Sequence, residues 1–78
     1  MTTQLRNLLN PKKLLLSKWT AAPALNKEKH FLVIKVVPPL VPGAAIIEVE
    51  LEAVHSKRVI TLAWRDLSDA ALWRQGWV

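Results

Sequence analysis

The chain has 78 residues, a formal net charge of +5 and no cysteine, and 51% of its residues are hydrophobic. This length fits one small domain over residues 1–78, with residues 1–9 expected to form a flexible or helical N-terminal arm. The hydrophobic fraction is too high for a disordered chain, and the lack of cysteine excludes disulfides and thiolate metal sites. No secretory signal and no run of roughly 20 apolar residues occurs, so we expect a cytoplasmic protein without a membrane span.

The first elements of the chain are expected to be short. Asn10 followed by Pro11 is a helix-start signal, because Asn can cap free N–H groups and Pro fits the first helical position. A turn or two of helix is therefore expected over residues 11–16. Residues 17–21 can run extended, and Pro23 should end that stretch.

The middle of the chain combines a buried strand with a proline-rich loop. Residues 31–37 are apolar except for Lys35 and rich in Val and Ile, which is typical of a strand buried on both faces. Residues 38–43 contain three prolines, which remove backbone donors and cannot pair as a central strand. This segment is expected to be a connecting loop with a turn at Pro42 and Gly43.

The clearest pattern is a β-hairpin. Residues 47–53 alternate apolar side chains with three glutamates, and residues 59–64 follow after a short polar tip. A loop centred on Ser56 and Lys57 would pair residues whose numbers sum to 113. On the inner face this register opposes Ala53 with Ile60, Leu51 with Leu62 and Val49 with Trp64. On the outer face it opposes Glu52 with Thr61 and Glu48 with Arg65.

The C-terminal block, residues 64–77, holds three of the four tryptophans. Ser68 can cap a short helix that continues to Gln75, and Gly76 can end it. We expect two of these indoles, Trp64 and Trp73, to fill the core, and Trp77 to be the most exposed.

These elements predict a mainly β protein. The favoured architecture is a small antiparallel sheet of four or five short strands curled into an SH3-like or OB-like barrel. A short N-terminal helical turn would precede the sheet, and a short Trp-bearing C-terminal helical turn would close it. The alternative is an open three-stranded sheet with the C-terminal helix packed across one face.

Two tryptophan-bearing motifs also carry a family resemblance. The motifs are Asn10-Pro11-x-Lys13-Leu14-Leu15-x-Ser17-Lys18-Trp19-Thr20-Ala21 and Trp64-Arg65-x-Leu67-x-Asp69-x-x-x-Trp73-x-x-Gly76-Trp77, with Glu28-Lys29-His30-Phe31-x-Val33 between them. They resemble the small tryptophan-rich bacterial proteins carried as conserved hypotheticals of unknown function. The resemblance spans residues 10–77 and implies a bacterial, stand-alone domain. It brings no activity, cofactor or catalytic residue.

The sequence offers little for catalysis. It has no nucleophile elbow, no glycine-rich phosphate loop and no pair of histidines with metal-ligand spacing. His30 and His55 are expected at the surface or at an edge, and the glutamate row of residues 48–52 is expected to be a solvated face. We therefore expect a protein that is not an enzyme, with no catalytic residue, cofactor, metal or small-molecule substrate.

Charge is unevenly distributed along the chain. Residues 1–45 carry seven basic residues and one acidic residue, whereas residues 46–78 carry four basic and five acidic residues. A basic face with an aromatic ring suits a polyanion, so the first functional hypothesis is binding to nucleic acid, as RNA or on the ribosome. Its candidate residues are Lys12, Lys13, Lys18, Trp19, Lys29 and Arg58. The alternative is a protein-interaction or assembly factor that docks through Leu40, Val41 and Trp77.

Overall fold

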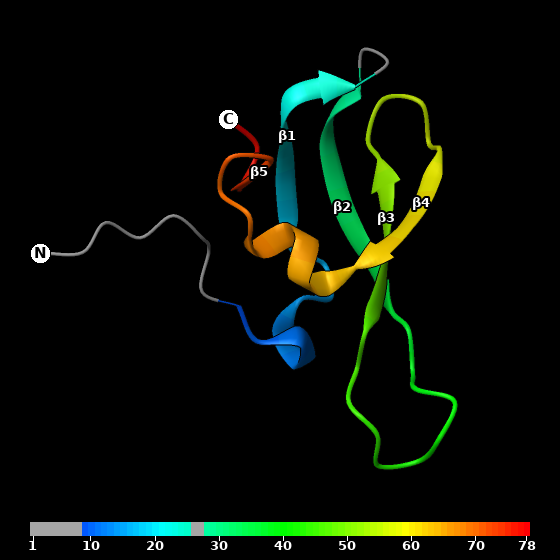
Figure 1. Cartoon of the computed structure of the whole chain (residues 1–78). Coiled ribbons are helices and arrows are strands. Elements are labelled where there is room, and N and C mark those ends of the chain that lie inside the picture. The colour runs from blue at the N-terminus through cyan, green and yellow to red at the C-terminus, as the bar shows by residue number, and fades with distance from the viewer. Residues whose placement is uncertain (1–8, 26–27) are drawn as a thin grey trace, which may run out of the picture.

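The computed structural model describes residues 9–25 and 28–78, which form one five-stranded antiparallel sheet and two short 3-10 turns. The elements, in chain order, are η1 (Pro11–Lys13), β1 (Lys18–Leu25), β2 (Glu28–Val36), β3 (Glu48–Ala53), β4 (Val59–Ala63), η2 (Trp64–Ser68) and β5 (Trp73–Gln75). In space the strand order is β4-β3-β2-β1-β5 (Figure 1). The expected N-terminal arm lies outside the described residues except for Leu9, which packs against the core.

The prediction of a mainly β fold is confirmed, but the sheet is open and the barrel was wrong. β4 and β5 are the two edge strands and do not pair with each other. η2 leaves β4, passes over one face of the sheet and delivers the chain to the free edge of β1 (Figure 1). The sheet is thus bridged by a turn of helix, where a barrel would need backbone hydrogen bonds between the edges. The alternative of an open three-stranded sheet was correct in its openness but wrong in its number of strands and in its C-terminal helix.

The expected C-terminal helix over residues 68–75 does not form. Residues 64–68 make η2, and residues 73–75 form β5, which places Trp73 opposite Ala21 of β1. The Trp73 ring packs edge-on against Phe31, with ring centroids 5.3 Å apart and planes at 79°. Burial of this indole against the sheet outweighs the local capping signal at Ser68.

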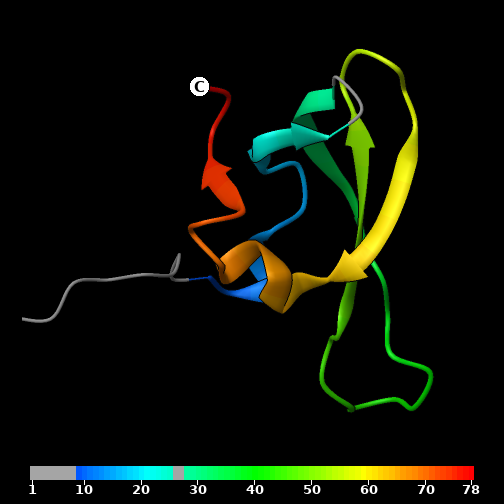
Figure 2. The ribbon, with the colours of Figure 1, turned by 45° about the horizontal axis from the view of Figure 1, so that its top comes forward.

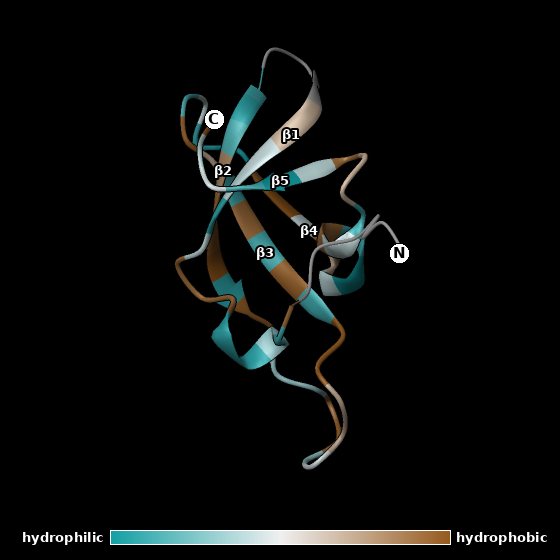
Figure 3. Ribbon diagram, turned by 90° about the vertical axis from the view of Figure 1, so that its left-hand side faces the viewer, coloured by the Kyte–Doolittle hydropathy of each residue, from teal (hydrophilic) through white to brown (hydrophobic). Residues whose placement is uncertain are grey.

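One face of the sheet, which we call the inner face, carries the core. Its buried members come from four strands, from η2 and from the residue that follows η1: Leu14, Trp19, Ala21, Phe31, Val33, Val49, Leu51, Ala53, Leu67 and Trp73. Along β3 the side chains alternate between hydrophobic and hydrophilic (Figure 3). Leu14 of the η1 connection and Leu67 of η2 cover this face, so the two short turns take the place of a second layer.

The β3–β4 hairpin has the expected faces but not the expected register. Leu51 lies opposite Ile60 and Val49 opposite Leu62, so paired numbers sum to 111. The turn occupies residues 54–57, and the N–H of Lys57 donates to the Ala53 carbonyl at 2.9 Å. Lys57 adopts φ +66°, a left-handed conformation that closes such a loop. A shift of two residues keeps every side chain on its face, which explains why the alternation pattern did not reveal it.

Other local predictions were correct only in part: the expected strand over residues 31–37 forms as β2, but Leu32 and Ile34 are half-buried, so it is not buried on both faces. Asn10 caps η1 by accepting the N–H of Lys12, as its sequence signal indicated. β1 continues through Pro23 instead of ending before it. In β2 the register shifts by one residue between Val33 and Lys35, so both Val33 and Val36 can contact the core. No helix in the described part of the chain is long and apolar enough to cross a membrane.

Candidate functional site

Trp19 is part of the core and cannot act as a stacking platform. Its side chain is 1% exposed, and its indole N–H donates to the Ser17 hydroxyl at 2.8 Å. Trp19 was a candidate contact for nucleic acid, a role that needs an accessible ring, and its burial contradicts that prediction. Trp19 of β1 is paired with Phe31 of β2, and directly opposed residues point to the same face of a sheet. The indole therefore points inward with the Phe31 ring.

The candidate basic residues divide between two ends of the sheet. Lys12 and Lys13 of η1 lie at one end, where Lys13 lines a shallow hollow with Lys18 at the start of β1. Lys29, near the start of β2, and Arg58, beside the β3–β4 turn, lie at the other end (Figure 1). The antiparallel pairing of β1 with β2 produces this separation. Lys18 lies between the two groups, since it lines the hollow with Lys13 and pairs with Leu32, three residues along β2 from Lys29.

Arg58 is engaged in an ion pair that the sequence did not predict. Its guanidinium donates through Nε and Nη2 to the carboxylate of Glu28, which also accepts the hydroxyl of Ser56. Glu28 is buried, and these hydrogen bonds, first from Arg58 and then from Ser56, lower the pKa of Glu28 below its ordinary value. The pair also raises the pKa of Arg58. The cluster fastens the β3–β4 turn to the start of β2, which is a structural role.

The C-terminal tail, residues 76–78, lies against β1 and β2. Gly76 has φ +82°, and its carbonyl accepts the Thr20 hydroxyl, which in turn accepts the N–H of Val78. The Trp77 indole N–H donates to the Phe31 carbonyl at 2.9 Å. The ammonium of Lys18 lies 4.8 Å from the Trp77 ring centroid. Trp77 is 41% exposed, more than Trp19 or Trp73, and is held in place by these contacts.

Trp64 is half-buried and supports the loop that joins β2 to β3. Its indole N–H donates to the Ile46 carbonyl at 2.9 Å, and its backbone N–H donates to the Ile47 carbonyl at 2.9 Å. The guanidinium of Arg65 lies 5.6 Å from the ring centroid. Trp64 thereby holds the last two residues of this loop, Ile46 and Ile47, against the end of β4.

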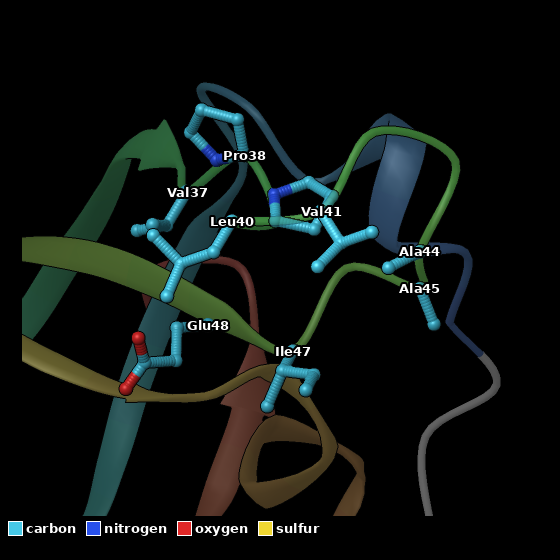
Figure 4. Close-up of a pocket in the computed structure, with 9 residues that line it drawn as sticks. Val37, Pro38, Leu40, Val41, Ala44, Ala45, Ile47 and Glu48 are labelled. Carbon is cyan, nitrogen blue, oxygen red and sulfur yellow. The ribbon is translucent and has the colours of Figure 1, made fainter.

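That loop, residues 37–47, is an exposed apolar segment, and we call it the apolar loop. It contains no charged side chain, and Leu40, Val41 and Ile47 are exposed. Its two limbs are joined at the base by a 3.0 Å hydrogen bond from the Val37 N–H to the Glu48 carbonyl. Between them lies a hollow of about 580 Å³ (Figure 4). The hollow is lined by Val37, Pro38, Pro39, Leu40, Val41, Ala44, Ala45, Ile47 and Glu48.

The three predicted docking residues do not form one patch. Leu40 and Val41 lie in the apolar loop at one extreme of the molecule, and Trp77 lies in the tail near the opposite extreme (Figures 1 and 2). Ile47 and the hollow were not predicted as part of the site. The sequence does carry a signal for them, since no charged residue occurs between Lys35 and Glu48.

The glutamates of β3 do not converge on a ligand. Glu48 is exposed, and Glu50 and Glu52 are half-buried on the face opposite Val49 and Leu51. Across residues 9–25 and 28–78, no three His, Asp or Glu side chains are grouped so that they could hold a metal ion.

Comparison with known proteins supports the resemblance noted in the sequence. The family model described as tryptophan-rich protein (DUF2389) matches residues 17–78, which include all four tryptophans. No curated protein and no solved structure matches the chain.

Proposed function

Because the chain belongs to the tryptophan-rich protein family DUF2389, a family of unknown function, we propose a function from its own geometry: a non-enzymatic binding module that docks on a protein partner through the apolar loop. The observation that carries this proposal is the exposure of Leu40, Val41 and Ile47 around one apolar hollow. Exposed apolar side chains gathered in one place are typical of interaction sites.

The alternative of nucleic-acid binding is less well supported. Its aromatic residue, Trp19, is buried, and Arg58 is already paired with Glu28. A single-strand groove needs accessible rings beside a continuous basic track. Lys29 begins β2, whereas Lys12 and Lys13 precede β1, so the candidate lysines do not lie side by side on one element.

The chemistry of the hollow suggests what the partner presents. Its walls are apolar except for Glu48, whose side chain is among those that line it (Figure 4). Glu48 is exposed and makes no ion pair within the described residues. A peptide segment with an apolar side chain next to a Lys or Arg would fill the hollow and satisfy this carboxylate. An anionic lipid surface would instead be repelled by it.

Selection of displayed random peptides on the immobilised protein tests the proposal. Enriched peptides should pair an apolar residue with a basic one. Their affinity should fall by about tenfold or more for Leu40→Asp and for Val41→Asp, because buried anchor residues dominate such interfaces. Leu72→Asp is the matched control, since Leu72 is exposed but lies outside the loop, and it should bind as the wild type does.

Two results would contradict the proposal. One is a set of peptides that bind all three variants equally. The other is binding to single-stranded RNA that survives both loop variants and falls by an order of magnitude or more between about 50 and 200 mM salt, as counterion release predicts.

A further inference from the structure

β4 presents an unused row of backbone hydrogen-bonding groups. The Ala53 N–H donates to the Arg58 carbonyl and the Trp64 N–H to the Ile47 carbonyl, so those two pairs are hydrogen-bonded. Hydrogen-bonded pairs alternate along an antiparallel ladder, which turns the backbone groups of Val59, Thr61 and Ala63 away from β3. β4 is an edge strand, and these groups have no strand partner in the described part of the chain.

The two edges of the sheet differ in how they are protected. Proteins usually guard an edge with a charged residue, a proline, a bulge or a very short strand. β5 has three residues and includes Arg74. β4, in contrast, is five uncharged residues with a regular register and no proline. Its unguarded edge is therefore competent for strand addition.

The side chains beside this edge are also incompletely covered. On the inner face Ile60 and Leu62 are only half-buried, although they pack against the core. On the outer face Val59 is 45% exposed. A strand added beside β4 would cover apolar surface on both faces while completing the backbone ladder.

We propose that the β4 edge binds the β4 edge of a second copy of this chain, antiparallel about a twofold axis at Thr61. In this register Thr61 pairs with Thr61 of the second copy and Val59 with its Ala63. The backbone groups of Val59, Thr61 and Ala63 all point outward, so each of these intermolecular pairs can exchange two hydrogen bonds. The two sheets would then join into one continuous sheet.

The argument for a second copy is that the strand is self-complementary. The twofold register sets Ile60 beside Leu62 of the other copy on the inner face, and threonine beside threonine on the outer face. Within β4 no charged residue meets a like charge, because the strand has none. An isologous contact of this kind closes on itself and leaves no further β4 edge open.

Sedimentation equilibrium on the full chain tests the proposal. The wild type should change with concentration from 8.8 kDa to twice that mass. Thr61→Pro removes one outward N–H from each copy and none from the β3–β4 ladder, so folding should be retained. It should weaken dimerisation by roughly tenfold or more, since two intermolecular bonds are lost. Amide exchange at Val59, Thr61 and Ala63 should also slow as concentration rises.

Two further variants keep the test decisive if Thr61→Pro does not fold. Thr61→Lys places two like charges opposite each other on the axis and should give a monomer with a native circular dichroism spectrum. Val41→Lys changes the apolar loop instead and should remain a dimer. A wild type that stays monomeric, or a dimer abolished by Val41→Lys and not by Thr61→Lys, would overturn the proposal while leaving peptide docking at the loop a separate question.

Discussion

At the scale of single residues, burial decides what the charged and aromatic side chains can do. Trp19 and Arg58 were predicted as contacts for nucleic acid, yet the first is inside the core and the second is bound to Glu28. The ion pair of Glu28 was not predicted, because its partners Ser56 and Arg58 are remote in sequence. An acidic residue in a basic half of a chain is therefore a candidate for a structural role.

Glu28 gives a prediction about stability and pH. Its pKa is lowered in the folded protein by hydrogen bonds from Arg58 and Ser56, so its carboxylate stabilises the fold above the unfolded-state pKa, which is near the ordinary value of 4.5. That contribution is lost as the pH falls from there through the folded-state pKa. Urea unfolding should thus show Glu28→Gln less stable than the wild type at pH 7, with the gap narrowing below about pH 4.5. A gap that is constant with pH would contradict this account.

At the scale of elements, the β3–β4 hairpin shows what alternation leaves undetermined. Val49 and Leu51 face inward as expected, but their partners are two residues away from those expected. Both registers place apolar side chains on one face, so the choice depends on the turn. The turn over residues 54–57 is held in place by the hydrogen bonds that Ser56 and Arg58 donate to the carboxylate of Glu28.

Engineered disulfides can distinguish the two registers, because the natural chain has no cysteine. Glu48 and Ala63 form a directly opposed pair that is not hydrogen-bonded, with Cα atoms expected about 4.5 Å apart. Glu48→Cys with Ala63→Cys should therefore oxidise to an intramolecular disulfide. The matched pair Glu50→Cys with Ala63→Cys, opposed only in the register expected from sequence, should keep its thiols. Titration of free thiols in the monomer fraction measures the outcome, and the reverse pattern would refute the observed register.

At the scale of the whole molecule, one buried residue links the two edges of the sheet. η2 joins β4 to β5 across the inner face, and Leu67 is its fully buried contact. The sheet has no second layer beyond the two helical turns, so this contact holds the last strand in register against β1.

Leu67→Ala should consequently destabilise the protein as a unit. Removing a buried leucine costs about 2–5 kcal/mol, against a total of roughly 4–12 kcal/mol expected for 78 residues. Leu72→Ala is the control, since Leu72 is exposed, and it should change the free energy of unfolding by about 0.5 kcal/mol or less. Thermal unfolding followed by tryptophan fluorescence and by circular dichroism would measure both. Equal melting temperatures for the two variants would show that Leu67 contributes no more to stability than the exposed Leu72.

The sequence by itself determined the local features of this protein. It placed the cap at Asn10, the strands of the hairpin, the inner face of β3 and the exposed loop with Leu40 and Val41. Each depends on neighbours within a few residues, where capping, strand alternation and proline act directly.

Only the tertiary structure decided the long-range pairings. Trp73 lies in a strand although its sequence neighbours favour a helix. It pairs with Ala21 at the edge of β1, and its ring packs against that of Phe31. The same holds for the separation of Lys29 from Lys12 and Lys13 and for the capture of Arg58 by Glu28. These outcomes depend on which segments meet in space, and burial gained there exceeds local propensity.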